Sequence, residues 1–145
     1  MDTYETLNEV LVNLFRDIMD IEQKVIITGE FKDITNNDMH VIDAIGIGEP
    51  KNMSTIAKTL SVTVGTLTIA MNSLVKKGYV HRERGKEDRR VVYISLSERG
   101  RAAYEHHARF HKAMIDSVSE NLSSEELEIL VRTLTKLNKW FRDWQ

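Results

Sequence analysis

Apolar side chains recur at helical spacing near both ends of the chain, and this pattern constrains the fold more than any other feature. The steps alternate between three and four residues, which places each set along one side of an α-helix. The first helix is expected over about residues 4–27, and the second follows the serines at 123–124 and the acidic pair at 125–126, which are good start signals. The two seams consist of Leu7, Leu11, Leu14, Ile18, Ile21 and Val25, and of Leu127, Leu130, Leu134, Leu137, Phe141 and Trp144.

Apolar faces this wide need a surface to cover them. Folding back onto the middle of the same chain would cover one side of each helix, whereas a second copy with interlocking helices would cover the rest. We therefore expect a homodimer, held by a helical dimerisation part over about residues 4–30 and 98–145. A third long helix, from its cap Ser97 to about Ser119, belongs to this part. A monomeric helical bundle is the alternative.

The composition is that of one ordinary globular domain. The chain has 145 residues, of which 41% are hydrophobic and 29% charged, and its single proline, Pro50, favours long helices over a β-sandwich. Cysteine is absent, which excludes disulfides, thiolate nucleophiles and cysteine-ligated metal sites. The acidic start does not resemble a signal peptide, and no apolar run approaches the ~18 residues of a membrane span, so we expect a cytoplasmic protein.

The formal net charge of −2 conceals an uneven distribution. Residues 51–101 hold 11 Lys/Arg and 4 Asp/Glu, whereas the rest of the chain holds 9 and 18. A basic middle between acidic ends is typical of a module that binds a polyanion. An ordinary solvated charged face is the alternative interpretation.

Short elements with clear start and stop signals make up this middle region. They end in a β-hairpin whose connecting loop is polar and basic. Helices followed by such a hairpin predict a winged helix-turn-helix over about residues 35–97, inside a single mainly helical domain spanning residues 1–145. The expected elements are helices over 36–45, 55–60 and 64–77, capped by Thr35, Ser54 and Thr63, and strands over 79–82 and 91–96.

This layout fits duplex DNA. A helix about 10 Å wide enters a major groove about 12 Å wide, and the hairpin tip reaches the adjacent minor groove. The outward side chains of the third helix are too small for bidentate arginine–guanine contacts, whereas valine and threonine methyls suit thymine and Asn72 suits an adenine edge. We therefore expect A/T-rich sites. The candidate DNA-contacting residues are Ser54, Thr63, Val64, Gly65, Thr66, Thr68, Asn72, Arg82, Arg84, Lys86, Asp88, Arg89 and Arg90.

Asp88 and Arg90 stand two residues apart near the hairpin tip and can lie on the same side. An ion pair between them would orient the arginine for insertion into a narrow minor groove. The alternative is a pair that only stabilises the turn. The other cations of the loop, Arg84, Lys86 and Arg89, favour the DNA-binding interpretation.

Three motifs follow one another in and after the basic region: Asn72-x-Leu74-x-x-Lys77-Gly78-Tyr79-Val80-x-Arg82, Asp88-Arg89-Arg90-Val91 and Leu96-Ser97-x-x-Gly100. Together they resemble the MarR family of bacterial transcription regulators, and the order of elements agrees over nearly the whole chain. The resemblance implies a symmetric dimer with interlocked terminal helices. It further implies that the helix from Thr63 reads the major groove, that Arg90 enters the minor groove and that Asp88 anchors Arg90.

A narrower likeness is carried by Phe31-Lys32-Asp33-Ile34, Met39-His40-x-Ile42-Asp43, Val62-Thr63-x-Gly65-Thr66 and Arg109-Phe110-His111-Lys112-Ala113-Met114. These segments resemble the repressors of type II fatty-acid synthesis genes in Gram-positive bacteria, which implies acyl-acyl carrier protein as corepressor and partner. An acyl chain needs an apolar tunnel, for which the candidate lining residues are Phe31, Met39, Ile42, Phe110 and Met114. Ordinary core packing is the alternative for these five. A MarR-type regulator of other genes, sensing another small ligand or a metal ion, is the alternative function.

No motif in the sequence supports catalysis, so we expect neither an enzyme nor a cofactor. His107 and His111 stand four residues apart on one helical face, a spacing that can bind a metal, and some MarR relatives sense zinc. Without cysteine or a clear acidic cluster, we expect no metal site there. A dimerisation module without DNA binding is a further alternative, but it leaves the basic hairpin unexplained.

Overall fold

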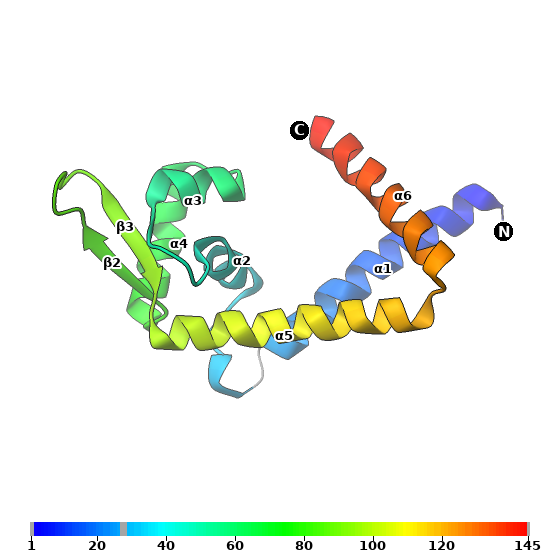
Figure 1. Cartoon of the computed structure of the whole chain (residues 1–145), viewed down its shortest axis with the longest axis horizontal. Coiled ribbons are helices and arrows are strands. Elements are labelled where there is room, and N and C mark those ends of the chain that lie inside the picture. The colour runs from blue at the N-terminus through cyan, green and yellow to red at the C-terminus, as the bar shows by residue number, and fades with distance from the viewer. Residues whose placement is uncertain (1, 27–28, 145) are drawn as a thin grey trace. The chain divides into compact units, whose positions relative to one another are not determined.

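The computed structural model describes residues 2–26 and 29–144, which Figure 1 draws as a coloured ribbon. These residues divide into two compact units, one through Ala108 and one from Arg109 onward. The boundary falls inside helix α5. The described residues are mainly helical with a small antiparallel sheet, which confirms the predicted fold class. The elements are α1 (Thr3–Ile26), a 3₁₀ helix η1 (Gly29–Phe31), α2 (Asn36–Ile45), β1 (Lys51–Asn52), α3 (Met53–Leu60), α4 (Val64–Lys77), β2 (Val80–Arg84), β3 (Val92–Leu96), α5 (Glu98–Asn121) and α6 (Ser124–Asp143).

Several helix ends follow the capping signals in the sequence. Thr35 and Asp38 form a capping box at α2, in which each side chain accepts a hydrogen bond from the backbone N–H of the other residue. Ser123 and Glu126 do the same at α6. Gly78 ends α4 in the left-handed conformation, at φ 86°, which glycine adopts without steric cost. These ends are therefore determined by side-chain chemistry within a single turn.

Helix α3 starts earlier than predicted, because Asn52 rather than Ser54 is its cap. The Asn52 side chain accepts a hydrogen bond from the Thr55 N–H at 2.8 Å. Asn52 is also the last residue of β1, a strand of two residues that the prediction missed. A strand this short shows no alternation of apolar and polar residues, so neither the strand nor the cap at its end was visible in the pattern. Ser54 lies in the first turn of α3 instead.

The sheet has the order β1-β3-β2, and both neighbouring pairs are antiparallel. In the hairpin, Val80 pairs with Leu96 and Arg82 pairs with Ile94, so these four side chains share one face. The three apolar residues among them are buried, whereas Arg82 is exposed. Strand β2 also runs two residues further toward the tip than predicted. The opposite face carries His81, Glu83, Tyr93 and Ser95.

The core of the first unit lies between α2, α3, α4 and the β2–β3 hairpin. Leu67, Met71 and Leu74 point into it from α4, as their spacing predicts. Gly100, in the first turn of α5, packs against the backbone of Tyr79, and a Cβ at this position would lie 2.1 Å from the Tyr79 carbonyl oxygen. The close approach of α5 to the start of the hairpin therefore requires glycine.

Helices α1 and α6 leave most of their apolar side chains exposed in the single chain. In α1 the buried residues are Glu22 and Ile26, and α6 contains no buried residue. The aromatic rings of Trp140, Phe141 and Trp144 pack against one another on α6. Both predicted seams are thus present on helices but are not covered within their own units. Within the described part of the chain, none of the helices combines the length and apolarity that a membrane crossing needs.

Candidate nucleic-acid interface

Helix α4 turns one face to the core and leaves the other face outside. The buried positions follow helical spacing, so the predicted DNA-contacting residues fall on the remaining face. This face is small and weakly polar, as expected from the sequence. Its exposed residues include Val64, Gly65, Thr66, Ile69 and Asn72, and Thr68 is half-buried.

Hydrogen bonds organise the hydroxyl groups at the start of α4. The Thr63 hydroxyl accepts from the Thr66 N–H at 3.1 Å and donates to Thr66 Oγ1 at 2.9 Å. The Thr68 hydroxyl donates to the Val64 carbonyl oxygen at 2.8 Å. Thr66 can therefore donate its own hydroxyl hydrogen to an acceptor outside the protein, whereas Thr68 offers chiefly its methyl group and an oxygen lone pair.

A bidentate ion pair holds the tip of the hairpin. Arg90 donates from Nε to Asp88 Oδ1 at 3.1 Å and from Nη2 to Asp88 Oδ2 at 3.0 Å, and its backbone N–H also bonds to Oδ1. The hydrogen bonds from Arg90 hold the pKa of the Asp88 carboxyl below its usual range. The ion pair orients the Arg90 guanidinium, and the guanidinium remains accessible because the side chain is 91% exposed. The predicted ion pair is therefore present.

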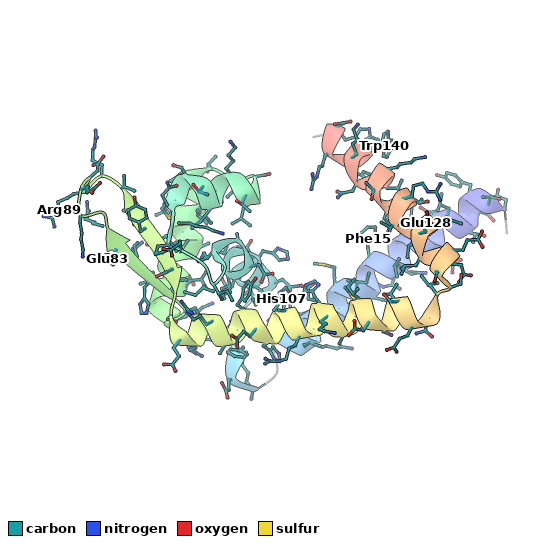
Figure 2. The ribbon with its side chains drawn as sticks, in the orientation of Figure 1. Phe15, Glu83, Arg89, His107, Glu128 and Trp140 are labelled. Atoms are coloured by element: carbon teal, nitrogen blue, oxygen red, sulfur yellow. The ribbon has the colours of Figure 1, made fainter. Side chains whose placement is uncertain are left out.

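Two further hydrogen bonds to backbone carbonyl oxygens close the turn beyond this pair. The Gly85 N–H donates to the Val91 carbonyl oxygen at 2.8 Å, and Arg84 Nη1 donates to the Arg89 carbonyl oxygen at 3.1 Å. A Cβ at Gly85 would lie 2.5 Å from the Asp88 carbonyl oxygen, so this turn depends on glycine. Figure 2 shows Arg89 at the outer end of the hairpin.

A groove of about 450 Å³ lies between the first turns of α3 and α4 and the hairpin. Arg82 and Arg90 line it on the hairpin side, and Val64 and Thr68 line it on the α4 side. Two arginines therefore meet the N-terminal end of a helix, where backbone N–H groups and the helix dipole also favour an anion. The remaining lining residues are Ser54, which was predicted to contact DNA, and Asn52, Met53, Val91 and Val92.

Lys86 does not share this groove. It lines a second hollow of about 400 Å³, together with Tyr93 and other residues of the opposite hairpin face. Two carboxylates, Glu49 and Glu83, also line this hollow, so its charge is mixed. The structure thus separates Lys86 from the arginines of the groove.

Asn72 contacts the hairpin rather than standing alone on α4. Its Oδ1 accepts a hydrogen bond from Arg82 Nη1 at 2.6 Å. This contact was not predicted, because the two residues lie on different elements and neither helical nor strand periodicity relates them. Their occurrence in a single motif was the one signal that pointed to a link between them.

A polar cluster fastens the C-terminal end of α4 to α2 and to the segment before it. Lys77 donates to the Asp33 carbonyl oxygen at 2.7 Å and to Asp38 Oδ2 at 2.8 Å. The Tyr79 hydroxyl donates to Asp33 Oδ1 at 2.5 Å, and the Arg99 guanidinium lies 4.3 Å from the centre of the Tyr79 ring. Burial and the hydrogen bond with Asp33 raise the pKa of Tyr79. This cluster, which the sequence analysis also missed, keeps one end of α4 in place.

His107 is buried between two carboxylates inside the first unit. Its Nε2 lies 2.6 Å from Glu22 Oε1 and its Nδ1 lies 2.8 Å from Asp43 Oδ2, so α5, α1 and α2 meet at this side chain. Although burial opposes protonation, the hydrogen bonds and charges of Asp43 and Glu22 raise the pKa of His107. Both ring nitrogens therefore serve ion pairs between helices. His111, the other histidine considered as a metal ligand, belongs to the second unit.

The five candidate tunnel residues are divided between the units. Phe31, Met39 and Ile42 are buried in the core of the first unit. Phe110 and Met114 belong to the second unit and are half-buried. Packing in the core accounts for the first three, and the acyl tunnel stays a prediction.

The reading face of α4, the clamped hairpin and the basic groove define a winged helix-turn-helix module suited to duplex DNA. The model of the MarR family matches residues 34–92. Streptococcus pneumoniae FabT, solved in complex with DNA, is 38% identical and aligns over 98% of this chain and 99% of that chain, with a TM-score of 0.91. The regulator SarZ of Staphylococcus haemolyticus is 36% identical over 104 residues, which cover 70% of this chain and 68% of SarZ. The chain belongs to the MarR family and is a DNA-binding transcriptional regulator.

Another relative matches this chain over a shorter part of its own length. The uncharacterized HTH-type transcriptional regulator YwhA of Bacillus subtilis is 35% identical over 82 residues, which cover 57% of this chain and 59% of YwhA. The match therefore spans less than two thirds of that protein. These relatives are transcriptional regulators and not enzymes, in agreement with the lack of catalytic motifs in the sequence.

Proposed function

We propose that this protein is a homodimeric repressor that binds a pseudo-palindromic, A/T-rich operator and controls fatty-acid biosynthesis genes in response to acyl-acyl carrier protein. The observation that carries the DNA-binding half of the proposal is the groove in which Arg82 and Arg90 meet the N-terminal end of α4. The exposed face of α4 enters the major groove, and Arg90, held by Asp88, enters the minor groove. The cytoplasm is the compartment where such a regulator meets the chromosome.

The chemistry of α4 supports an A/T preference. Val64 and the Thr68 methyl group suit the C5-methyl of thymine, and the Thr66 hydroxyl can donate to a base or phosphate acceptor. Gly65 lets the backbone of the first turn approach the duplex. A narrow A/T-rich minor groove attracts an exposed guanidinium, and Arg90 presents one. Thr63, Arg84, Lys86 and Arg89 complete the proposed contact surface.

The exposed apolar faces of α1 and α6 support the dimer. A second copy that covers them would place two reading helices on one side of the duplex, with half-sites about 10 base pairs apart. The operator would then share the two-fold symmetry of the protein.

The fatty-acid branch of the proposal is supported by the sequence segments that resemble fatty-acid synthesis repressors and by the similarity to FabT. The acyl chain would enter a tunnel lined by Phe31, Met39, Ile42, Phe110 and Met114. A ligand that prefers one arrangement of the DNA-binding units changes the affinity for DNA by the same factor by which DNA changes the affinity for the ligand.

The test begins with duplexes that the purified protein selects from a random-sequence pool, followed by fluorescence anisotropy at several salt concentrations. We expect A/T-rich inverted repeats, and log K should fall by roughly 0.9 per phosphate contact for each log unit of salt. Adding long-chain acyl-acyl carrier protein should change the affinity, whereas the unacylated carrier should not. A protein that selects no duplex at low salt is not the proposed repressor. A carrier effect that does not depend on the acyl chain removes the fatty-acid branch alone.

A further inference from the structure

The Asn72 carboxamide is engaged by a side chain of the protein itself, and this partner, Arg82, lines the groove. Asn72 Oδ1 lies 2.6 Å from Arg82 Nη1, and Arg82 shares the groove with Thr68 and Arg90. Val64, Thr68 and Asn72 recur every four residues, so they form one stripe along α4. Val64 and Thr68 line the groove, and Asn72 contacts the hairpin through its hydrogen bond with Arg82.

We infer that Asn72 is a positioning residue, which holds the Arg82 guanidinium over the groove so that Arg82 contacts a DNA phosphate. The inference rests on the proposed DNA-binding function and deepens it. A bidentate contact with adenine needs Oδ1 as an acceptor and Nδ2 as a donor. Because Oδ1 accepts from a guanidinium, reading an adenine would require Asn72 to give up or share that bond. The inference thus gives Asn72 an indirect role in place of the adenine-edge role predicted from the sequence.

Arg82 lies on β2, where its exposed guanidinium needs a hydrogen-bond partner to fix its orientation. Its two neighbours on the same face of the hairpin, Val80 and the cross-strand partner Ile94, are buried at 3% and 0% exposure, so they pack into the core beside it. The arginine side chain is long and flexible, and ordering it costs entropy when DNA binds unless it is ordered beforehand. A hydrogen bond from α4 supplies that order and also ties the reading helix to the hairpin.

The two side chains that orient the groove arginines differ in charge, and the difference fits a phosphate contact by Arg82. Arg90 is held by the Asp88 carboxylate, which offsets part of its charge. Arg82 is held by a neutral amide, which orients the guanidinium and leaves its full positive charge for the phosphate. The groove therefore contains two arginines with different tasks. Arg90, in a fixed orientation, suits a base edge, and Arg82, with its full charge, suits a phosphate of the DNA backbone.

A double-mutant cycle tests the inference on the duplex selected by the wild-type protein. We expect Asn72→Ala to weaken binding about fivefold and Arg82→Ala about tenfold, and we expect the double variant to bind no worse than Arg82→Ala, because residues that act as one unit are not additive. Arg82→Ala should also lower the salt slope by about 0.9, the value for one phosphate contact. Asn37→Ala, an exposed asparagine on α2, is the matched control and should bind like wild type.

A modified duplex supplies a readout that a direct base contact would move. Replacing adenine by 7-deazaadenine removes the N7 acceptor that a reading asparagine needs. We expect the wild-type protein and Asn72→Ala to lose the same factor of affinity on this duplex. Additive losses in the cycle, or a 7-deaza penalty that disappears in Asn72→Ala, would overturn the inference while leaving the proposed function intact. A wild-type protein that binds no duplex would overturn both.

Discussion

The winged region and the terminal helices use their apolar residues in opposite ways. In the winged region, Ile42, Met71 and Leu74 are each 0% exposed and pack against residues of the same unit. In α6 no residue is buried, and Val131 remains 58% exposed. The difference teaches that the winged region completes its own core, whereas the terminal helices carry apolar surface that only another surface can cover.

The largest effect is expected from charges placed on the exposed face of α6. Replacing Val131 and Leu134 together by Glu should cost the single chain little, because these side chains are 58% and 51% exposed. Burying two unpaired carboxylates in a dimer costs several kcal/mol, so the dimer dissociation constant should rise at least ~1000-fold. Sedimentation equilibrium measures this constant. Lys136→Glu, off the apolar seam, should leave the dimer intact, and an unaffected dimer in the double variant would place the interface elsewhere.

A stability effect confined to the winged region should follow from Gly100→Ala. The new methyl group would lie 2.1 Å from the Tyr79 carbonyl oxygen, so the start of α5 must move away from the hairpin. We expect the free energy of unfolding, measured in urea, to fall by about 2–3 kcal/mol, the usual cost of overpacking. The matched control is Gly48→Ala, whose methyl group meets no atom within 4 Å. Equal stability of the two variants would show that α5 does not depend on this close approach.

The DNA-contacting face should respond to Arg90→Ala through affinity rather than stability. The side chain is 91% exposed, so its removal should leave the unfolding free energy within ~0.5 kcal/mol of wild type. Duplex binding should weaken by about 2 kcal/mol, with the larger loss on A/T tracts. Arg16→Ala removes the same charge from α1 and serves as the control in the anisotropy assay. Equal affinity of Arg90→Ala and wild type would exclude the hairpin tip from recognition.

The smallest effect concerns the pH dependence of stability. It arises at His107, which pairs with Glu22 of α1 and Asp43 of α2. Its pKa in the folded protein is raised above the ordinary 6.5, so protonation favours the folded state. The contribution is fully present below pH 6.5 and is lost as pH rises through the folded-state pKa. His107→Gln should flatten this part of the profile of urea midpoint against pH. An unchanged slope in the variant would show that Glu22 and Asp43 do not stabilise the imidazolium.

The features that could be predicted from the sequence were those with local signals. Helix α4 begins after Thr63 and ends at Gly78 because a cap and a left-handed glycine act within one turn. The Asp88–Arg90 ion pair was predictable because its members stand only two positions apart in the sequence. The contacts of Asn72 with Arg82, and of Asp33 with Tyr79, join different elements, so periodicity contains no information about them. Only the folded chain brings those side chains together.

The division of α4 between a fastened end and an exposed end has a consequence for how this regulator can change over evolutionary time. The side chains that hold the helix are Leu67, Met71, Leu74 and, at its last turn, Lys77. The side chains that face outward near the start of the helix, such as Val64 and Thr66, are exposed and do not pack in the core. Thr66 takes part only in the local cap with Thr63. Operator preference can therefore drift by substitution at the outer positions while the fold keeps its stability, and a duplicated copy can acquire new target genes without first being restabilised.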